Sequence, residues 1–324
     1  MKLVAVVGAT ATGKSQLGLA LADALNGEVV SCDSTAVYRG LDIGTDKLPP
    51  ADRRGVPHHL VDVVDPREVY SAARYAADAA EAIRGITARG RVPLLVGGTG
   101  FYYRALVRGL FPGPARDEPL RARLNRVADR RGVAALFRWL ARVDPASARR
   151  IQPRDRKRLV RALEVYLLTG RPLTAHFQAT APPIADLDVL VFGLRTPRAE
   201  AAARIARRVD EQFARGVVEE VRGLLAAGVP ADAHAFSGLV YRQIVEFLQG
   251  VRSEADTRTL IVRENLRYTR RQVTWFRKEP GVHWVDHASP ADRDAVAIAA
   301  ARSFMDVAPA HRETPVASSA SPAR

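Results

Sequence analysis

The N-terminal part of the chain alternates between short apolar runs and glycine-rich or amphipathic segments. An unbroken apolar run predicts a buried strand over residues 3–7, and the glycines after it predict a loop over residues 8–15. Leu17, Leu21 and Leu25 then share one face of a helix predicted over residues 16–25. Further buried strands are predicted over three segments, 28–31, 92–96 and 189–194. Such an alternation is typical of an α/β fold, a parallel sheet with helices on both faces whose ligands bind at the carboxyl ends of the strands.

The pattern changes between Phe111 and Asp188, where helical periodicity continues without a convincing buried strand and prolines mark both ends. We therefore predict an inserted helical domain over residues 112–188. The α/β core then consists of residues 1–111 and 189–307. Helical periodicity returns within this core over residues 198–278.

The charge of the chain is strongly basic and unevenly distributed. The net charge is +14, from 49 basic and 35 acidic residues, and 44 of the basic residues are arginines. Arginine binds phosphate with two parallel hydrogen bonds, although a GC-rich genome would also favour its codons. Residues 116–161 hold fifteen basic side chains against five acidic ones, whereas a solvated helix face usually mixes both signs. The predicted insertion is therefore a candidate nucleic-acid surface.

Cysteine content and hydropathy indicate the compartment. The lone Cys32 excludes a disulfide framework and a zinc site built from cysteines, so a reducing cytosol is the simplest location. The N-terminal apolar run is too short for a signal peptide, and no stretch approaches the roughly 20 apolar residues that span a bilayer. We expect a cytoplasmic protein with no membrane partner. The Ala-Pro-Ser-Thr composition of residues 308–324 predicts a disordered tail.

The strongest motif runs from Gly8 to Ser15 and fits the phosphate-binding pattern G-x-x-x-x-G-K-[ST] in full, between a predicted strand and a predicted helix. Its glycines let backbone N–H groups turn toward phosphate oxygens, and the following helix adds the positive end of its dipole. Lys14 would neutralise the terminal phosphates, and the Ser15 hydroxyl would bind Mg²⁺. The predicted phosphate-binding residues are Gly8, Ala9, Thr10, Ala11, Thr12, Gly13, Lys14 and Ser15.

Two further features would face the same crevice. Asp33 follows the second predicted strand and could hold Mg²⁺ or act as a general base, with a turn or capping aspartate as the structural alternative. Arg204 and Arg208 are four residues apart and share a helix face. As a pair they could neutralise a leaving diphosphate, although a lone arginine is more typical of an exposed surface.

Several motifs, in the right order along residues 3–287, resemble those of the tRNA dimethylallyltransferases, the IPP transferase family. They are DSTAVYRGLDIGT (33–45), PHHLVDV (57–63), YSA (70–72), LLVGGTG (94–100), DRKRLVRALE (155–164) and RRQVTWFR (270–277). Because separate motifs agree, the resemblance is highly specific.

The resemblance implies a P-loop NTPase-like core and a reaction. A dimethylallyl group moves from dimethylallyl diphosphate to the N6 amine of the adenosine 3′-adjacent to the anticodon, position 37 of the tRNA, and diphosphate is released. In this family the P-loop holds the diphosphate of the prenyl donor instead of ATP, and Mg²⁺ assists. By motif, the catalytic residues are Asp33, Thr99 and Arg208, and Arg208 stabilises the leaving diphosphate together with Lys14 and Ser15.

The family's helical insertion grips the anticodon stem-loop, and its target base leaves the stack to reach the crevice. The tRNA contacts carried over by motif are Asp33, Ser34, Thr35, Ala36, Thr99, Arg121, Lys157, Arg158, Leu159, Val160, Arg161, Ser237, Gly238, Leu239, Val240, Tyr241 and Arg242. Two positions depart from the family pattern. Val240 stands where a glycine is usual, and Ala9 replaces the usual proline of the P-loop.

Three other readings fit parts of the sequence. A small-molecule P-loop kinase would use Asp33 to activate a hydroxyl group, but it leaves the basic insertion unexplained. An adenylate prenyltransferase would not need so basic an insertion. A nucleotide-gated RNA-binding protein without chemistry would not require Asp33 beside the P-loop. We expect the protein to act as a monomer.

Overall fold

The computed structural model describes residues 1–111, 113–177, 180–285 and 289–307, and its contacts divide the chain into two compact units. The sheet unit consists of residues 1–71, 78–102 and the described residues from Asp186 onward. The helical unit consists of residues 72–77 and 103–185. Residues 103–111, which the sequence pattern assigns to the core, thus belong to the helical unit. The prolines near residue 112 mark a change in composition, whereas the contacts between residues change earlier in the chain.

The sheet unit is built on six parallel strands in the order β3-β2-β4-β1-β5-β6. The strands are β1 (Lys2–Gly8), β2 (Gly27–Cys32), β3 (His58–His59), β4 (Val92–Gly97), β5 (Asp188–Leu194) and β6 (Val282–Val285). The four predicted strands are confirmed to within a residue or two, and they form the centre of the sheet. The edge strands β3 and β6 were not predicted.

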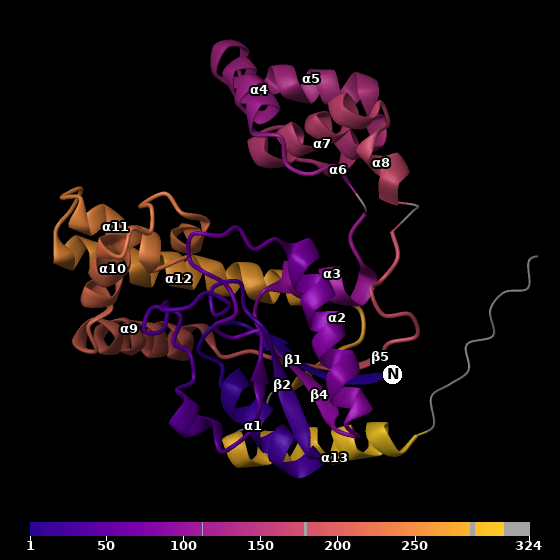
Figure 1. The fold of residues 1–324 in the computed structure, drawn as a ribbon, viewed down its shortest axis with the longest axis vertical. Helices are drawn as coiled ribbons and strands as arrows, with labels where there is room; N and C mark the ends of the chain where they lie inside the picture. Colours follow the sequence, from indigo (N-terminus) through magenta and orange to yellow (C-terminus); the bar gives the residue numbers. More distant parts are fainter. Residues whose placement is uncertain (112, 178–179, 286–288, 308–324) are drawn as a thin grey trace, which may run out of the picture. The chain divides into compact units, whose positions relative to one another are not determined.

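Helices cover both faces of this sheet, which confirms the predicted fold class. On one face, Val4 and Val6 of β1 share a buried core with α1 (Lys14–Leu25) and α13 (Pro290–Asp306). The alternate residues Leu3, Ala5 and Val7 point to the other face, are equally buried, and lie on the strand that α12 (Glu254–Phe276) contacts. Figure 1 shows α1 and α13 below the strands and α12 above them.

The sheet unit also contains further helical segments. They are η1 (Pro50–Arg53), α9 (Arg198–Ala214), α10 (Val217–Ala226), η3 (His234–Ser237) and α11 (Tyr241–Leu248). Helices α2 (Ala72–Ala88) and α3 (Gly100–Arg108) belong partly to each unit. The helical periodicity predicted over residues 198–278 corresponds to α9, α10, η3, α11 and α12. Gly216 separates α9 from α10, and Gly228 separates α10 from η3; both glycines have a positive φ.

The helical unit contains α4 (Glu118–Arg131), α5 (Val133–Val143), α6 (Pro145–Arg150), α7 (Arg156–Thr169) and α8 (Leu173–His176). Asp117, Asp144 and Asp155 cap the starts of α4, α6 and α7 by accepting backbone N–H groups. The unit has its own core, which includes Leu136 and Leu163. No strand occurs among its described residues, as predicted.

In the part of the chain that the structure describes, no helix combines the length and apolar character needed to cross a bilayer. The tail predicted over residues 308–324 lies outside the described residues.

Candidate active site

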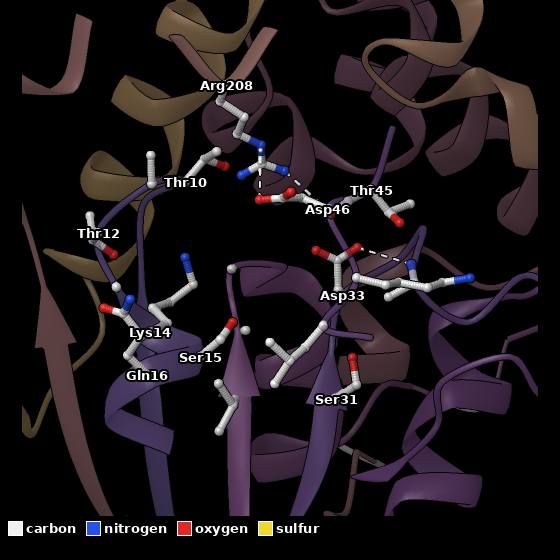
Figure 2. Close-up of a pocket in the computed structure, with 18 of the residues that line it drawn as sticks. Thr10, Thr12, Lys14, Ser15, Gln16, Ser31, Asp33, Thr45, Asp46 and Arg208 are labelled. Atoms are coloured by element: carbon white, nitrogen blue, oxygen red, sulfur yellow. Dashed lines mark hydrogen bonds and ion pairs between the residues drawn. The ribbon is translucent and has the colours of Figure 1, made fainter. Parts of the chain in front are cut away.

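A cavity of about 960 Å³ opens at the carboxyl ends of β1, β2 and β4. The loops after these strands supply Thr10–Ser15, Asp33 and Gly97–Gly98, and α9 supplies arginines from the opposite side. This is the place where parallel α/β sheets bind ligands. Figure 2 shows Lys14, Ser15 and Asp33 on the strand side of the hollow and Arg208 across from them.

The P-loop has the backbone geometry that phosphate binding requires. Gly8 has a φ of 140°, and a Cβ atom there would collide with the carbonyl oxygen of Leu194 in β5. Ala11 and Gly13 also have positive φ values, 61° and 85°. Helix α1 begins directly after Gly13 and has no side-chain cap, so its first N–H groups and its dipole favour an anion.

Lys14 is the central cation of the loop. Its ammonium group donates a hydrogen bond to the carbonyl oxygen of Ala9. Burial lowers the pKa of Lys14 to about 8, the nearby carboxylate of Asp33 opposes this shift, and the guanidinium of Arg208 adds to it. Two cations and one carboxylate thus act on each other within this cavity, and a bound anion would relieve the repulsion between the cations.

The Asp33 carboxylate is fixed by one of its two oxygens. Oδ1 accepts hydrogen bonds from the N–H and hydroxyl of Thr35, at 2.8 and 2.7 Å, and from the Ala36 N–H at 3.3 Å. Within the described residues, Oδ2 has no hydrogen-bond or ion-pair partner and stays available to a ligand in the cavity that Asp33 lines. An anchored carboxylate with one open oxygen has the form of a general base or a metal ligand.

Thr99 joins the loops after β2 and β4. Its hydroxyl oxygen accepts the Ser34 N–H at 3.1 Å, and its own N–H donates to the carbonyl of Cys32 at 3.1 Å. The predicted residues Asp33, Ser34 and Thr99 are therefore neighbours, although Ser34 and Thr99 are 65 residues apart in the sequence.

Both predicted arginines of α9 line the cavity. Arg208 lies 3.3 Å from the Asp46 carboxylate through Nε and donates to the Thr45 carbonyl at 3.3 Å through Nη2. Arg204 donates to the P-loop carbonyl of Ala11 at 3.1 Å and pairs with Glu200. The Arg208 side chain is only 24 % exposed, so the interpretation of Arg208 as an ordinary surface arginine is less favoured.

The residues present fit a magnesium ion held jointly with a substrate. No group of three or more His, Cys, Asp or Glu side chains able to hold a metal occurs among the described residues. Mg²⁺, however, usually keeps several waters and is held by one or two protein groups together with substrate phosphates. Among the oxygen donors that line this cavity, the Ser15 hydroxyl at the start of α1 and the open Oδ2 of Asp33 are candidates for this role.

Two of the predicted tRNA-contact segments lie against each other in the sheet unit. A Cβ atom on Gly238 would approach Thr35 Cγ2 to 2.8 Å, so the chain around residues 237–242 packs onto the loop after β2. Val240 has a φ of 75°, which is the conformation that glycine adopts most readily. A valine thus occupies a turn of the type that favours glycine, at the position where the resemblance led us to expect glycine. Tyr241 is fully buried and donates to Glu220.

The predicted contacts in the helical unit divide by burial. Leu159 and Val160 belong to the unit's core, so their side chains hold the helix and leave no surface for RNA. Arg121 and Arg161 pair with the buried carboxylate of Glu164. The other two predicted residues, Lys157 and Arg158, are exposed. Their roles in RNA binding stay predictions.

Two residues at this site escaped the sequence analysis. Gln272 of α12 accepts the Thr10 N–H at 3.0 Å and donates to the Gly98 carbonyl at 3.0 Å, so it joins the P-loop to the loop after β4. Its place in the RRQVTWFR motif was the available signal. Asp46, the partner of Arg208, follows the DSTAVYRGLDIGT motif directly, but nothing local connects it to α9.

Comparison with known proteins identifies relatives of this chain. The family model described as IPP transferase matches residues 36–279. The chain is 45 % identical over 303 residues to a tRNA dimethylallyltransferase of Geobacter sulfurreducens, covering 94 % of this chain and 97 % of the relative. It is 49 % identical over 289 residues to one of Thermomicrobium roseum, covering 89 % and 87 %.

Solved structures show the same relationship. A full-length tRNA isopentenylpyrophosphate transferase from Bacillus halodurans has a TM-score of 0.69 at 36 % identity, covering 94 % of this chain and 97 % of that chain. A eukaryotic dimethylallyltransferase, described as acting on tRNA, has a TM-score of 0.79 at 27 % identity, covering 96 % and 81 %. By the match of the family model, by these identities and by the shared fold, the chain belongs to the IPP transferase family.

Proposed function

We propose that this protein is a tRNA dimethylallyltransferase that moves the dimethylallyl group of dimethylallyl diphosphate to N6 of adenosine 37 and releases diphosphate. The observation that carries the proposal is the convergence of Lys14, Arg208 and an anchored, half-open Asp33 carboxylate on one cavity. The diphosphate needs positive charges, and the adenine amine, which must lose a proton, needs a carboxylate beside them.

In the proposed chemistry, the carboxylate acts on the attacking amine and the cations act on the leaving diphosphate. The exocyclic amine of adenine is a poor nucleophile because its lone pair is delocalised into the ring. Asp33 Oδ2 would accept a proton of that amine as the new C–N bond forms. The diphosphate gains charge as the allylic C–O bond breaks, and Lys14, Arg208 and the N-terminus of α1 would stabilise it.

Mg²⁺ is part of the proposal. The Ser15 hydroxyl would hold the ion together with oxygens of the diphosphate, which leaves Asp33 Oδ2 free to accept the proton. When bound, it would supply additional positive charge to the departing diphosphate.

The second substrate is proposed to be the anticodon stem-loop of tRNA, which approaches with the target adenosine out of its stack. Support comes from the names of the relatives and from the basic side chains of the helical unit. A cytoplasmic location and a monomeric state remain predictions.

The kinase reading is not favoured. Both curated relatives described above, and the eukaryotic structure, are named for dimethylallyl transfer. A kinase reading also gives no role to the fifteen basic side chains of residues 116–161.

The test is to incubate purified protein with unmodified tRNA, Mg²⁺ and dimethylallyl diphosphate and to analyse the digested nucleosides by mass spectrometry. We expect prenylated adenosine, and a loss of about 10²–10⁴-fold in rate for Asp33→Asn, because the amide cannot accept the proton. The amide oxygen can still accept from Thr35, so the melting temperature of this variant should stay near that of the wild type. Full activity of Asp33→Asn would refute the catalytic role. Consumption of ATP with a small hydroxyl compound, without any prenylated nucleoside, would favour a kinase.

A further inference from the structure

The Asp46 carboxylate joins two arginines at the rim of the cavity. Its Oδ2 lies 3.3 Å from Nε of Arg208, and its Oδ1 lies 3.4 Å from Nη1 of Arg215. Arg208 also donates from Nη2 to the carbonyl of Thr45. One edge of the Arg208 guanidinium is thus occupied by consecutive residues of a single loop, while no described residue bonds to its Nη1.

Figure 2 shows how the Arg208 guanidinium lies relative to Asp46. The guanidinium lies between Thr10 and Asp46, and both dashed contacts are on the Asp46 side. The unoccupied end of the guanidinium is left for the cavity that contains the P-loop. An arginine in solution samples many rotamers, and a fixed partner on one edge reduces the entropy lost when the other edge binds an anion.

The loop that carries Asp46 is itself held from both sides. The Glu220 carboxylate accepts the backbone N–H groups of Asp42, Ile43 and Gly44, at 2.9, 2.7 and 3.3 Å. Gln212 of α9 donates to the carbonyls of Ile43 and Gly44, at 3.2 and 3.1 Å. Since both types of backbone group are bonded, the loop cannot swing away and take Asp46 with it.

We propose that Asp46 is a positioning residue for the diphosphate, because it fixes the Arg208 guanidinium with its free end toward the P-loop. The negative charge of Asp46 by itself disfavours a bound diphosphate. The orientation of Arg208 outweighs that repulsion, since Arg208 and Arg215 both compensate the Asp46 charge. This inference rests on the proposed function only in naming dimethylallyl diphosphate as the ligand.

The test compares three variants with the wild type. Asp46→Ala removes both the charge and the hydrogen-bond acceptor, whereas Asp46→Asn removes the charge and keeps an oxygen that can accept from Arg208 Nε. Glu211→Ala is the matched control, because Glu211 lines the same cavity but pairs with Arg207. The measurements are the Kd for inorganic pyrophosphate by calorimetry, KM and kcat with dimethylallyl diphosphate and tRNA, and the melting temperature.

We expect Asp46→Ala to raise the pyrophosphate Kd and the KM for dimethylallyl diphosphate on the order of tenfold, as for the loss of a residue that orients a ligand-binding group. Asp46→Asn should recover most of this loss, and Glu211→Ala should leave both constants unchanged or lower them. A purely structural role would lower the melting temperature without separating the alanine and asparagine variants in Kd.

Two results would overturn the proposal. One is wild-type pyrophosphate binding in Asp46→Ala. The other is tighter binding in both Asp46→Ala and Glu211→Ala, which would make Asp46 only a repelling charge. Failure of the proposed function is a separate result, namely pyrophosphate binding by the wild type without any prenylated nucleoside.

Discussion

At the scale of single residues, the backbone of Val240 is unusual for a β-branched residue. Its φ of 75° and ψ of −61° place a β-branched side chain in the left-handed half of conformational space, directly before α11. Strain of this kind costs about 1–3 kcal/mol. The side chain is nevertheless 3 % exposed, so burial and strain oppose each other at one position.

Substitution at Val240 can separate these two effects. We expect Val240→Gly to be more stable than Val240→Ala by about 1 kcal/mol in urea unfolding, because only glycine relieves the strain. The same pair of substitutions at Val245, which is equally buried inside α11, should give the opposite order, since glycine in a helix is the less stable by about 1 kcal/mol. An alanine variant at position 240 that matches or exceeds the glycine variant would show that the turn is not strained.

Lys14 should give the reaction an alkaline limit. Its pKa of about 8 in the free protein means that the ammonium group is present below that pH and is lost above it. The KM for dimethylallyl diphosphate should therefore rise above pH 8, by up to about tenfold per pH unit, because the donor's diphosphate is already ionised there. Lys14→Arg should bind more weakly at pH 7 but keep a flat profile to about pH 10, since arginine stays protonated. A rise in KM that persists in Lys14→Arg would assign the limit to another group.

Local motifs predicted the positions of Asp33, Lys14 and Arg208 around the cavity, because each carries its signal within a few neighbouring residues. Asp46 and Gln272 could not be predicted in the same way. Their partners Arg208 and Thr10 are 162 and 262 residues away, and such a contact leaves no periodic pattern. What Asp33, Thr99 and the tRNA contacts do chemically stays a prediction until variants are assayed.

At the scale of elements, α12 supports the P-loop through one side chain. Gln272 is 6 % exposed and satisfies both the Thr10 N–H and the Gly98 carbonyl. A buried backbone group that loses its partner costs about 1–3 kcal/mol. The phosphate-binding loop therefore depends on a helix that is not adjacent to it in the sequence.

Gln272→Ala should lower the free energy of unfolding by about 1–3 kcal/mol and raise the KM for dimethylallyl diphosphate. The control is Thr259→Ala on the same helix, where an exposed hydroxyl bonds only to the carbonyl one turn earlier. Equal unfolding midpoints in the two variants would contradict the supporting role of Gln272.

The sequence predicted the central strands better than the edges. β1 and β4 are unbroken apolar runs because both faces of the sheet are covered. β6 has the sequence VHWV, which is short and half-exposed, and β3 consists of two histidines. These edges form because neighbouring strands offer hydrogen-bonding groups, which is a tertiary effect that residue pattern does not record.

At the scale of the whole molecule, we expect the excess positive charge to strengthen RNA binding. Arg123, Arg126 and Arg130 are exposed along one side of α4, and none of them forms an ion pair within the described residues. Three unpaired cations in a row are suited to phosphates of an RNA backbone, each of which releases a counterion when it is bound.

Arg126→Gln should weaken tRNA binding and reduce the slope of log K against log salt by about 1, without changing pyrophosphate binding. Arg302→Gln on α13 removes the same charge from an exposed position of the sheet unit and should leave the slope unchanged. Equal slopes in wild type and Arg126→Gln would contradict α4 as part of the RNA surface.

The contacts of the P-loop also determine when, during synthesis, the protein could first bind the proposed donor. Residues 8–15 leave the ribosome early, but Thr10 is held by Gln272, and Thr12 accepts from Arg293 of α13 at 3.4 Å. Nearly the whole chain must therefore be translated before the loop has its supports, and contacts of such long range form slowly. A nascent chain should thus present an exposed and incomplete loop to chaperones for most of its translation. The ability to capture dimethylallyl diphosphate would arise only when the final helices emerge.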